Sequence, residues 1–388
     1  MTYRPDAQVS SIYIHWPFCA YKCHFCPFVS FAGHEKFMAQ YNNTLNKEIE
    51  LFSKSSVQKA DIETLFIGGG TPSTWPDAQI LDTFDKLYNI LPLSKSAEVT
   101  IEVNPGTVRV EQLEIWRNVG INRLSVGVQS LNDSVLKNLN RHQKAQDVHN
   151  LLHSAKDYFD NTSIDLILGL PGVSDCEWKD LLKIVVGWPI HHISIYFLTI
   201  YEKTPIYYRI ESGEVDMVQD DDLVELYNWS VNFLEEHGFD RYEISNFAKK
   251  GYECRHNKVY WNRKPYRGFG LAACSFDGVS RFKNHKDLLR YIECVENCET
   301  RSKFFEFCEK LTDDQIRLEK LMLGLRTDQG VTREQMFEGL SKNQKERLES
   351  KILYLKSKKF IYERDERFVI SPNARTLENE IVLELLVT

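Results

Sequence analysis

Several features that would place this chain in another functional class are absent from its sequence. Its 388 residues include no apolar run long enough to span a bilayer. They include no long basic run, and a net charge of −7 argues against nucleic acid as a partner, because such binding depends on neutralised phosphates. The first ten residues, MTYRPDAQVS, lack the pattern of a signal or transit peptide. We therefore expect a cytoplasmic protein.

The cysteines lack the features of a disulfide framework. Their number, nine, is odd, and no secretory segment precedes them, so free thiols in a reducing compartment are expected. The chain also has no GxGxxG fingerprint after its first expected strand, which disfavours a nicotinamide-binding fold. No internal repeat or low-complexity run is found.

The most informative stretch that is present is SIYIHWPFCAYKCHFC, residues 11–26. It predicts a short strand that runs into a loop carrying Cys19, Cys23 and Cys26. A structural zinc site takes four protein ligands, whereas an outside molecule can supply the fourth ligand of a [4Fe–4S] cluster. Three cysteines therefore favour a cluster with one open iron. A zinc knuckle with His15 or His24 as fourth ligand stays open.

Strands alternate with helices through the first half of the chain. The first strand begins near residue 11, and the others are expected at residues 61–67, 97–103, 123–128, 163–168 and 192–198. Such alternation indicates a parallel sheet with right-handed connections. Six units are too few for a closed eight-stranded barrel. The sequence therefore predicts an α/β fold with a partial (β/α)6 barrel.

Chemically useful residues recur where these strands end. The cysteine loop follows the first strand, Gly68–Gly70 the second, Glu102 ends the third, Gln129 follows the fourth and Asp165 lies inside the fifth. Active sites of such barrels lie at the C-terminal ends of the strands. We therefore expect these residues to form one site.

The pattern changes after about residue 220. Helices are expected at residues 221–237, 282–298, 312–326 and 343–358, with an edge strand at 241–247, a loop-rich stretch at 248–278, and two short strands at 360–364 and 367–370. The end of the chain therefore predicts a helical, winged-helix-like domain. We expect three units: a barrel core (1–215), a barrel extension (216–298) and a C-terminal domain (299–388).

The cysteine stretch resembles a known motif. Tyr-x-His-x-Pro-Phe-Cys-x3-Cys-x-Phe-Cys, residues 13–26, is similar to the opening motif of the radical S-adenosylmethionine (SAM) superfamily. More narrowly, it resembles the branch that holds the oxygen-independent coproporphyrinogen III oxidases (HemN) and the haem chaperones (HemW). The resemblance implies a [4Fe–4S] cluster on the three cysteines. It also implies SAM on the open iron, where one electron splits the sulfonium into a 5′-deoxyadenosyl radical.

The resemblance also assigns residues to the SAM site. Gly69, Gly70 and Thr71 match a GGE-type motif that binds the methionine amino group, although the glycines alone equally predict a tight turn. The resemblance assigns the ribose hydroxyls of SAM to Glu102. Without the resemblance, a carboxylate at the end of a strand is more often simply solvated. The remaining positions at this site are Gln129, Arg141, Asp165 and, beside the adenine, Tyr13 and Phe25. Each aromatic residue alone is more often part of the core.

A second cluster, His256-Asn257-x-x-Tyr260-Trp261, matches an HNxxYW motif that the HemW group ties to haem binding. A histidine among aromatic residues is more often structural, yet it also suits a haem iron and its macrocycle. The group usually has GPGAHS where residues 270–275 read GLAACS, so Cys274 stands in a histidine position. The axial ligand of a haem iron therefore stays open.

Two differences separate this chain from the oxidases. Phe28 stands where they carry a fourth cysteine, and the motif begins without their N-terminal extension. The resemblance therefore implies a haem chaperone that holds a [4Fe–4S] cluster, SAM and haem, and transfers haem to a recipient haemoprotein, with peripheral contact to membrane-bound partners. The alternatives are a radical SAM enzyme acting on a tetrapyrrole, either an oxidase or a haem-degrading methyltransferase, and a zinc-stabilised barrel. Oligomeric state stays open.

Overall fold

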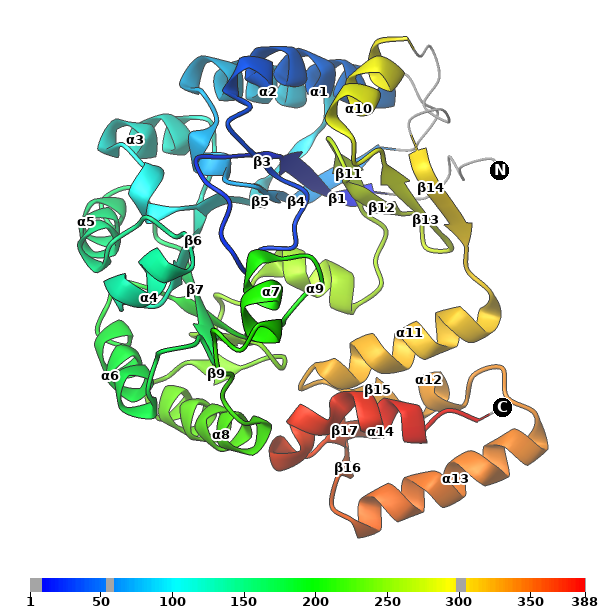
Figure 1. Cartoon of the computed structure of the whole chain (residues 1–388). Coiled ribbons are helices and arrows are strands. Elements are labelled where there is room, and N and C mark those ends of the chain that lie inside the picture. The colour runs from blue at the N-terminus through cyan, green and yellow to red at the C-terminus, as the bar shows by residue number, and fades with distance from the viewer. Residues whose placement is uncertain (1–8, 54–58, 298–304, 388) are drawn as a thin grey trace.

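The computed structural model describes residues 9–53, 59–297 and 305–387. Its centre is a nine-stranded sheet in the order β11-β1-β4-β5-β6-β7-β8-β10-β9 (Figure 1). The strands are β1 (Val9–Trp16), β4 (Lys59–Gly69), β5 (Leu93–Val103), β6 (Arg123–Gln129), β7 (Thr162–Leu168), β8 (His192–Phe197), β9 (Asp240–Arg241), β10 (Asn246–Ala248) and β11 (Arg267–Phe269).

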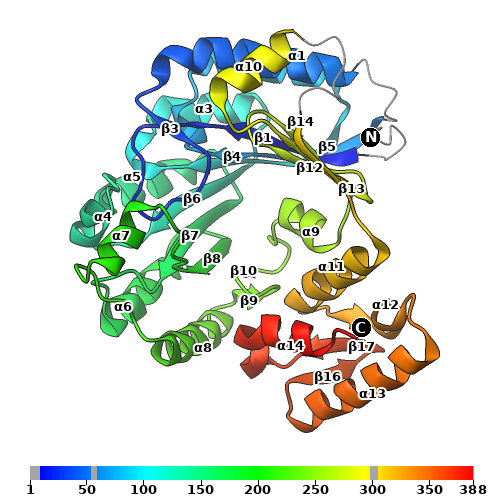
Figure 2. The same cartoon turned by 45° about the vertical axis from the view of Figure 1, so that its right-hand side comes forward.

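The six strands predicted from the sequence lie side by side in chain order. Neighbours from β1 to β8 pair in parallel, β11 adds a further parallel strand beside β1, and β10 pairs antiparallel with β8. The sheet curves without closing on itself, so the predicted partial barrel is confirmed (Figures 1 and 2).

Helices cover the outer face of the sheet. They are α1 (Met38–Ser53), α2 (Asp77–Ile90), α3 (Val110–Asn118), α4 (Asp133–Asn138), α5 (Ala145–Ala155), α6 (Asp175–Val185), α8 (Asp220–Glu236) and α10 (Leu288–Glu296). Except for α4, these helices pack their apolar stripes into one large core, whereas Val135 of α4 packs in a smaller cluster with Leu139, Leu170 and Ile206. Helix α9 (Arg255–Trp261) lies inside the curve of the sheet, whereas α7 (Pro205–Glu211) lies beside α4 and hydrogen-bonds the cysteine loop at His24 (Figure 2). No helix in the described ranges has both the length and the apolar character needed to cross a membrane.

Short elements complete the barrel. They are β2 (Phe18–Cys19) paired with β3 (Phe31–Ala32), the antiparallel sheet of β12 (Cys274–Phe276), β13 (Ser280–Asn284) and β14 (Phe305–Lys310), and the 3-10 turns η1 (Glu35–Phe37), η2 (Pro72–Thr74) and η3 (Pro105–Thr107). The β2–β3 pair flanks the cysteine loop, so the two ends of that loop are held against each other.

The end of the chain forms a separate helical unit with a small wing-like sheet. Its elements are α11 (Asp313–Arg326), β15 (Val331–Thr332), α12 (Arg333–Phe337), α13 (Lys342–Ser357), β16 (Ile361–Arg364), β17 (Arg367–Ile370), η5 (Pro372–Leu377) and α14 (Glu378–Glu384). The sheet order is β15-β17-β16, and the unit has its own hydrophobic core. This agrees with the predicted winged-helix-like domain.

Three local predictions were wrong. The helix expected at residues 282–298 is a strand followed by a shorter helix, because Phe282 pairs with Ser275 and Cys308 in a sheet that the local pattern does not reveal. The single edge strand at 241–247 is two short strands, β9 and β10. The loop expected around His256 is helix α9. The predicted domain boundary at 298/299 lies outside the described residues, so the three-unit division stays a prediction.

Candidate functional site

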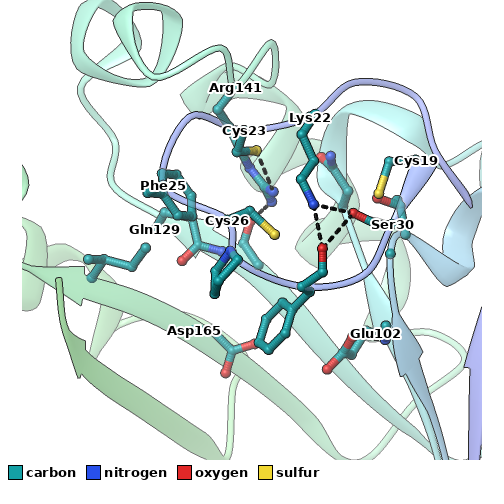
Figure 3. Close-up of a pocket in the computed structure, with 18 of the residues that line it drawn as sticks. Cys19, Lys22, Cys23, Phe25, Cys26, Ser30, Glu102, Gln129, Arg141 and Asp165 are labelled. Atoms are coloured by element: carbon teal, nitrogen blue, oxygen red, sulfur yellow. Dashed lines mark hydrogen bonds between the residues drawn. The ribbon is translucent and has the colours of Figure 1, made fainter. Parts of the chain in front are cut away.

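A cavity of about 390 Å³ opens at the C-terminal ends of the parallel strands. Cys19, Cys23 and Cys26 line one side of it, from the loop after β1 (Figure 3). The opposite wall comes from the ends of β4 to β8. The strand order places these ends next to one another. The prediction that the polar residues at the strand ends lie together is therefore confirmed for the residues that line this cavity.

The cysteine loop rests on a buried histidine. His15 Nε2 donates to the Val29 carbonyl at 2.9 Å, so Nδ1 accepts from the Tyr13 hydroxyl at 3.0 Å. Burial lowers the pKa of His15 to about 4, which keeps the ring neutral. A side chain at Gly69 would come within 2.7 Å of this ring, and its φ of +114° also requires glycine. The close fit of β4 against the loop therefore depends on Gly69.

Neither histidine near the loop joins the cysteines as a ligand. Both ring nitrogens of His15 already have partners. His24 does not line the cavity, its backbone hydrogen-bonds Leu139 and Ile206, and its Nδ1 is buried without a hydrogen-bond partner among the described residues. The structure therefore argues against a zinc site with His15 as its fourth ligand, and it places His24 outside the cavity that the three cysteines line.

Two cations steady the loop. Arg141 Nη1 donates to Cys23 Sγ at 3.8 Å, while its Nη2 donates to the Gly127 carbonyl at 2.6 Å. Lys22 Nζ donates to the Phe28 carbonyl and to Ser30 Oγ at 2.7 Å (Figure 3). Burial raises the pKa of the Cys26 thiol, and the Lys22 charge opposes that rise. The Lys22 charge therefore favours the Cys26 thiolate, the form that binds metals.

Two carboxyl groups line the cavity, Glu102 from β5 and Asp165 from β7 (Figure 3). Glu102 Oε2 accepts from the Gly69 backbone N–H at 3.1 Å, and Asp165 Oδ2 accepts from Ser125 Oγ at 3.1 Å. Burial, and then the charge of Asp165, raises the pKa of Glu102 to about 8. Burial also raises the pKa of Asp165. The pair can accept hydroxyl donors or face a positive centre.

Most of the residues assigned to the SAM site meet in this cavity. Its lining includes Phe25, Gly69, Gly70, Thr71, Glu102, Gln129, Arg141 and Asp165. Tyr13 does not line it; its ring stacks near Phe66 and its hydroxyl reaches His15. Sequence reasoning missed Tyr21, Phe28, Tyr196 and Tyr201 as lining residues. Tyr196 had a usable signal, because it lies near the end of the sixth predicted strand.

The HNxxYW residues lie elsewhere, on α9 between β4 and α11 (Figure 2). His256 is 1% exposed, and its two ring nitrogens contact Thr64 Oγ1 at 2.8 Å and the Tyr260 hydroxyl at 2.9 Å. The ring also stacks on Phe66. Burial lowers the pKa of His256 to about 3, so it stays neutral.

A buried carboxylate anchors the start of α9. Glu98 accepts from the backbone N–H groups of Arg255 and His256, each at 3.0 Å. Its charge also acts on the buried guanidinium of Arg123. At the far end, Arg326 of α11 lies 4.8 Å from the Trp261 ring and pairs with buried Glu243 at 2.7 Å. The motif thus links the barrel interior to the C-terminal unit.

Comparison with known proteins agrees with the geometry of the site. The radical SAM superfamily profile matches residues 13–185. A Bacillus subtilis protein named heme chaperone HemW is 32% identical over 376 residues, 96% of this chain and 98% of that one. A Synechocystis protein of the same name is 33% identical over 83% of this chain and 79% of its own.

A solved structure shares the fold over most of both chains. Coproporphyrinogen III oxidase (HemN) from Escherichia coli superposes with a TM-score of 0.84, over 98% of this chain and 91% of that one, at 22% identity. At that identity the likeness concerns the fold alone. Full-length similarity to the first relative, together with three cysteines at the strand ends, shows that this chain belongs to the HemW family of the radical SAM superfamily.

Proposed function

We propose that this protein is a haem chaperone that holds a [4Fe–4S] cluster and SAM, binds haem and transfers it to a recipient haemoprotein. The observation that carries the proposal is the three-cysteine cavity in a chain so similar, end to end, to a protein named heme chaperone HemW. Transfer would take place in the cytoplasm, with peripheral contact where the recipient is membrane-bound.

The cysteine loop fits a cluster better than a single zinc ion. Thiolates on one zinc lie about 3.8 Å apart, from Zn–S bonds of about 2.3 Å in a tetrahedron. In the described ranges, no three Cys, His, Asp or Glu side chains are gathered closely enough to hold one ion. A four-iron cube takes its cysteines at wider spacing. Cys19, Cys23 and Cys26 would hold the cluster, which when bound supplies an electron and an open coordination position.

The rest of the cavity fits SAM. Gly69 and Gly70 line the cavity, Phe25 offers an aromatic face for adenine, and the Glu102 carboxyl can accept from ribose hydroxyls. Arg141, beside Cys23, would place its charge near the methionine carboxylate. Gln129, Thr71 and Asp165 complete the polar lining.

A tetrapyrrole oxidase is the second function considered. The HemN-like fold motivates it. Against it stands Phe28, which occupies the position of the oxidases' fourth cysteine and is 65% exposed at the cavity rim. A phenyl ring supplies neither a thiol for chemistry nor a metal ligand. We therefore rank the chaperone above the oxidase.

The haem role of HNxxYW stays a prediction. For His256 to bind iron, it would have to release Thr64 or Tyr260 and open a site that is 1% exposed. Cys274, on the exposed side of β12, also stays a predicted alternative ligand.

Two assays test the proposal. In the first, reconstituted protein is titrated with haem and then mixed with a haem-free recipient, and the transfer is followed by absorption. Stoichiometric binding followed by transfer is expected; no haem-dependent absorption change would overturn the proposal.

The second assay uses anaerobic incubation with SAM, a strong reductant and coproporphyrinogen III. Unchanged coproporphyrinogen, from protein shown to contain its cluster, is expected. Protoporphyrinogen among the products would make the protein an oxidase instead.

A further inference from the structure

Tyr21 lies between the first two cysteines of the cysteine loop, and its half-buried side chain lines the cavity. It belongs to none of the motif positions that the resemblance assigns to SAM. Asn104, directly after β5, donates from Nδ2 to the Tyr21 hydroxyl oxygen at 2.6 Å. The Tyr21 ring also meets the His142 ring edge-on, with centroids 4.8 Å apart. Tyr21 therefore joins the cysteine loop to two separate segments of the barrel.

The direction of the hydrogen bond between Asn104 and Tyr21 follows from the other contact of the Asn104 amide. Asn104 Oδ1 accepts from the Gly106 backbone N–H at 3.2 Å, which fixes the oxygen on that side. The Nδ2 group therefore faces Tyr21, and an amide nitrogen can only donate. The phenol oxygen of Tyr21 accepts, so its own proton is left for another partner.

The phenol proton of Tyr21 has no acceptor among the residues that the structure describes, and the side chain lines the cavity. Asn104 is 5% exposed, so water competes little for its bond to the phenol. The hydroxyl is thus held at the cavity wall by a protein partner before any ligand arrives. A donor that is oriented in advance suits an acceptor on the ligand of the cavity.

The backbone next to Tyr21 is held by one further amide. Asn140 Nδ2 donates to the Lys22 carbonyl at 2.8 Å, and Asn140 Oδ1 accepts from His142 Nε2 at 2.9 Å. The same side chain therefore fixes the peptide that follows Tyr21 and the ring that packs on it. These contacts limit the movement of the Tyr21 side chain from two sides.

Arg141 supplies positive charge to the same cavity, but much of its hydrogen-bonding capacity is in use. Its Nε donates to Gln143 Oε1 at 2.8 Å, its Nη1 to Cys23 Sγ and its Nη2 to the Gly127 carbonyl. A carboxylate has about four lone-pair sites, more than the free N–H groups of this guanidinium can fill. A carboxylate beside Arg141 therefore has room for a second donor.

We propose that Tyr21 is a ligand-binding residue of the cavity, whose hydroxyl donates to the methionine carboxylate of SAM beside Arg141. A hydrogen bond to an ionised acceptor is stronger than one between neutral groups. The inference rests on the proposed SAM site and adds to it a residue of the cysteine loop itself. One loop then holds the cluster through its three cysteines and contacts SAM through Tyr21.

The test compares SAM with decarboxylated SAM, which keeps the adenosyl group, the sulfonium and the amine and lacks only the carboxylate. Binding of each is measured by anaerobic calorimetry on the full-length, cluster-reconstituted protein, with iron content determined for every sample. The variant is Tyr21→Phe, which keeps the ring that meets His142 and removes only the hydroxyl. Tyr208→Phe, at an exposed tyrosine of α7 outside the cavity lining, is the matched control.

We expect about tenfold weaker SAM binding in Tyr21→Phe, because a hydrogen bond to a charged group is lost. Binding of decarboxylated SAM should match the parent, and Tyr208→Phe should match it for both ligands. Unchanged SAM binding, or an equal loss for both ligands, would overturn the contact with the carboxylate. Loss of iron from Tyr21→Phe would overturn it as well, since the hydroxyl would then serve the loop. A parent protein that takes up no cluster or binds no SAM would instead overturn the cofactor part of the proposed function.

Discussion

The cysteine-loop cavity and helix α9 carry the two motifs that resemble cofactor sites, and they differ in what their polar atoms contact. In the cavity, carboxyl groups and thiols face a space of about 390 Å³. On α9, the imidazole of His256 and the backbone N–H groups at the helix start are already bonded to Thr64, Tyr260 and Glu98. The two regions show that the residue types of a motif do not determine whether its polar atoms are free to bind a ligand.

The largest effect is expected in the cavity. Replacing Cys19, Cys23 or Cys26 with serine should abolish cluster binding, because a three-ligand site has no ligand to spare. Iron content and visible absorption after anaerobic reconstitution measure this. Cys176→Ser, at an exposed thiol on α6, is the control and should keep its iron. Full iron loading in a loop variant would show that the ligands were misassigned.

On α9 the largest effect is on stability. Glu98→Ala should lower the free energy of unfolding by about 3 kcal/mol, because it leaves two helix N–H groups buried without their acceptor and removes a negative charge that acts on Arg123. Denaturant unfolding measures it, with exposed Glu114→Ala as the control. A loss below about 1 kcal/mol would mean that water replaces the carboxylate.

His256→Ala sharpens the comparison directly. It should cost about 2 kcal/mol of stability, since the Thr64 and Tyr260 hydroxyls lose a buried partner. His256→Gln should recover part of that loss, because an amide both donates and accepts. The haem spectra of both variants test the predicted haem role of α9. An iron–imidazole signature lost in His256→Ala with little change in stability would support that role, and a parent spectrum would contradict it.

The smallest effect, counted per pH unit, is a pH dependence in the cavity. The folded state holds a proton on Glu102 up to about pH 8, whereas the unfolded chain releases it near pH 4.5. Stability should therefore fall as pH rises through this window, by at most about 1.4 kcal/mol per pH unit. Glu102→Gln should flatten this slope, and exposed Glu111→Gln should not. Equal slopes in parent and Glu102→Gln would contradict the raised pKa.

Sequence reasoning reached the fold and most of the cavity because both rest on local patterns. The alternation of strands and helices predicted the partial barrel, and the polar residues at the strand ends predicted most of the cavity lining. It missed Tyr201, whose place depends on where an irregular loop returns. It also mistook the strand at Phe282 for helix, because that strand exists only through its partners.

By itself the sequence determined the order of the parallel strands, the cysteine spacing and the family, because hydrophobic period and motif spacing are read between near neighbours in the chain. The tertiary structure alone decided which polar groups are open. His256 is closed by Thr64, 192 residues away, and by Glu98, 158 residues away. Hydrogen-bond partners so far apart in the chain are determined by tertiary packing. Packing therefore decides that the cysteine motif faces a cavity, whereas the histidine of α9 is hydrogen-bonded inside the barrel.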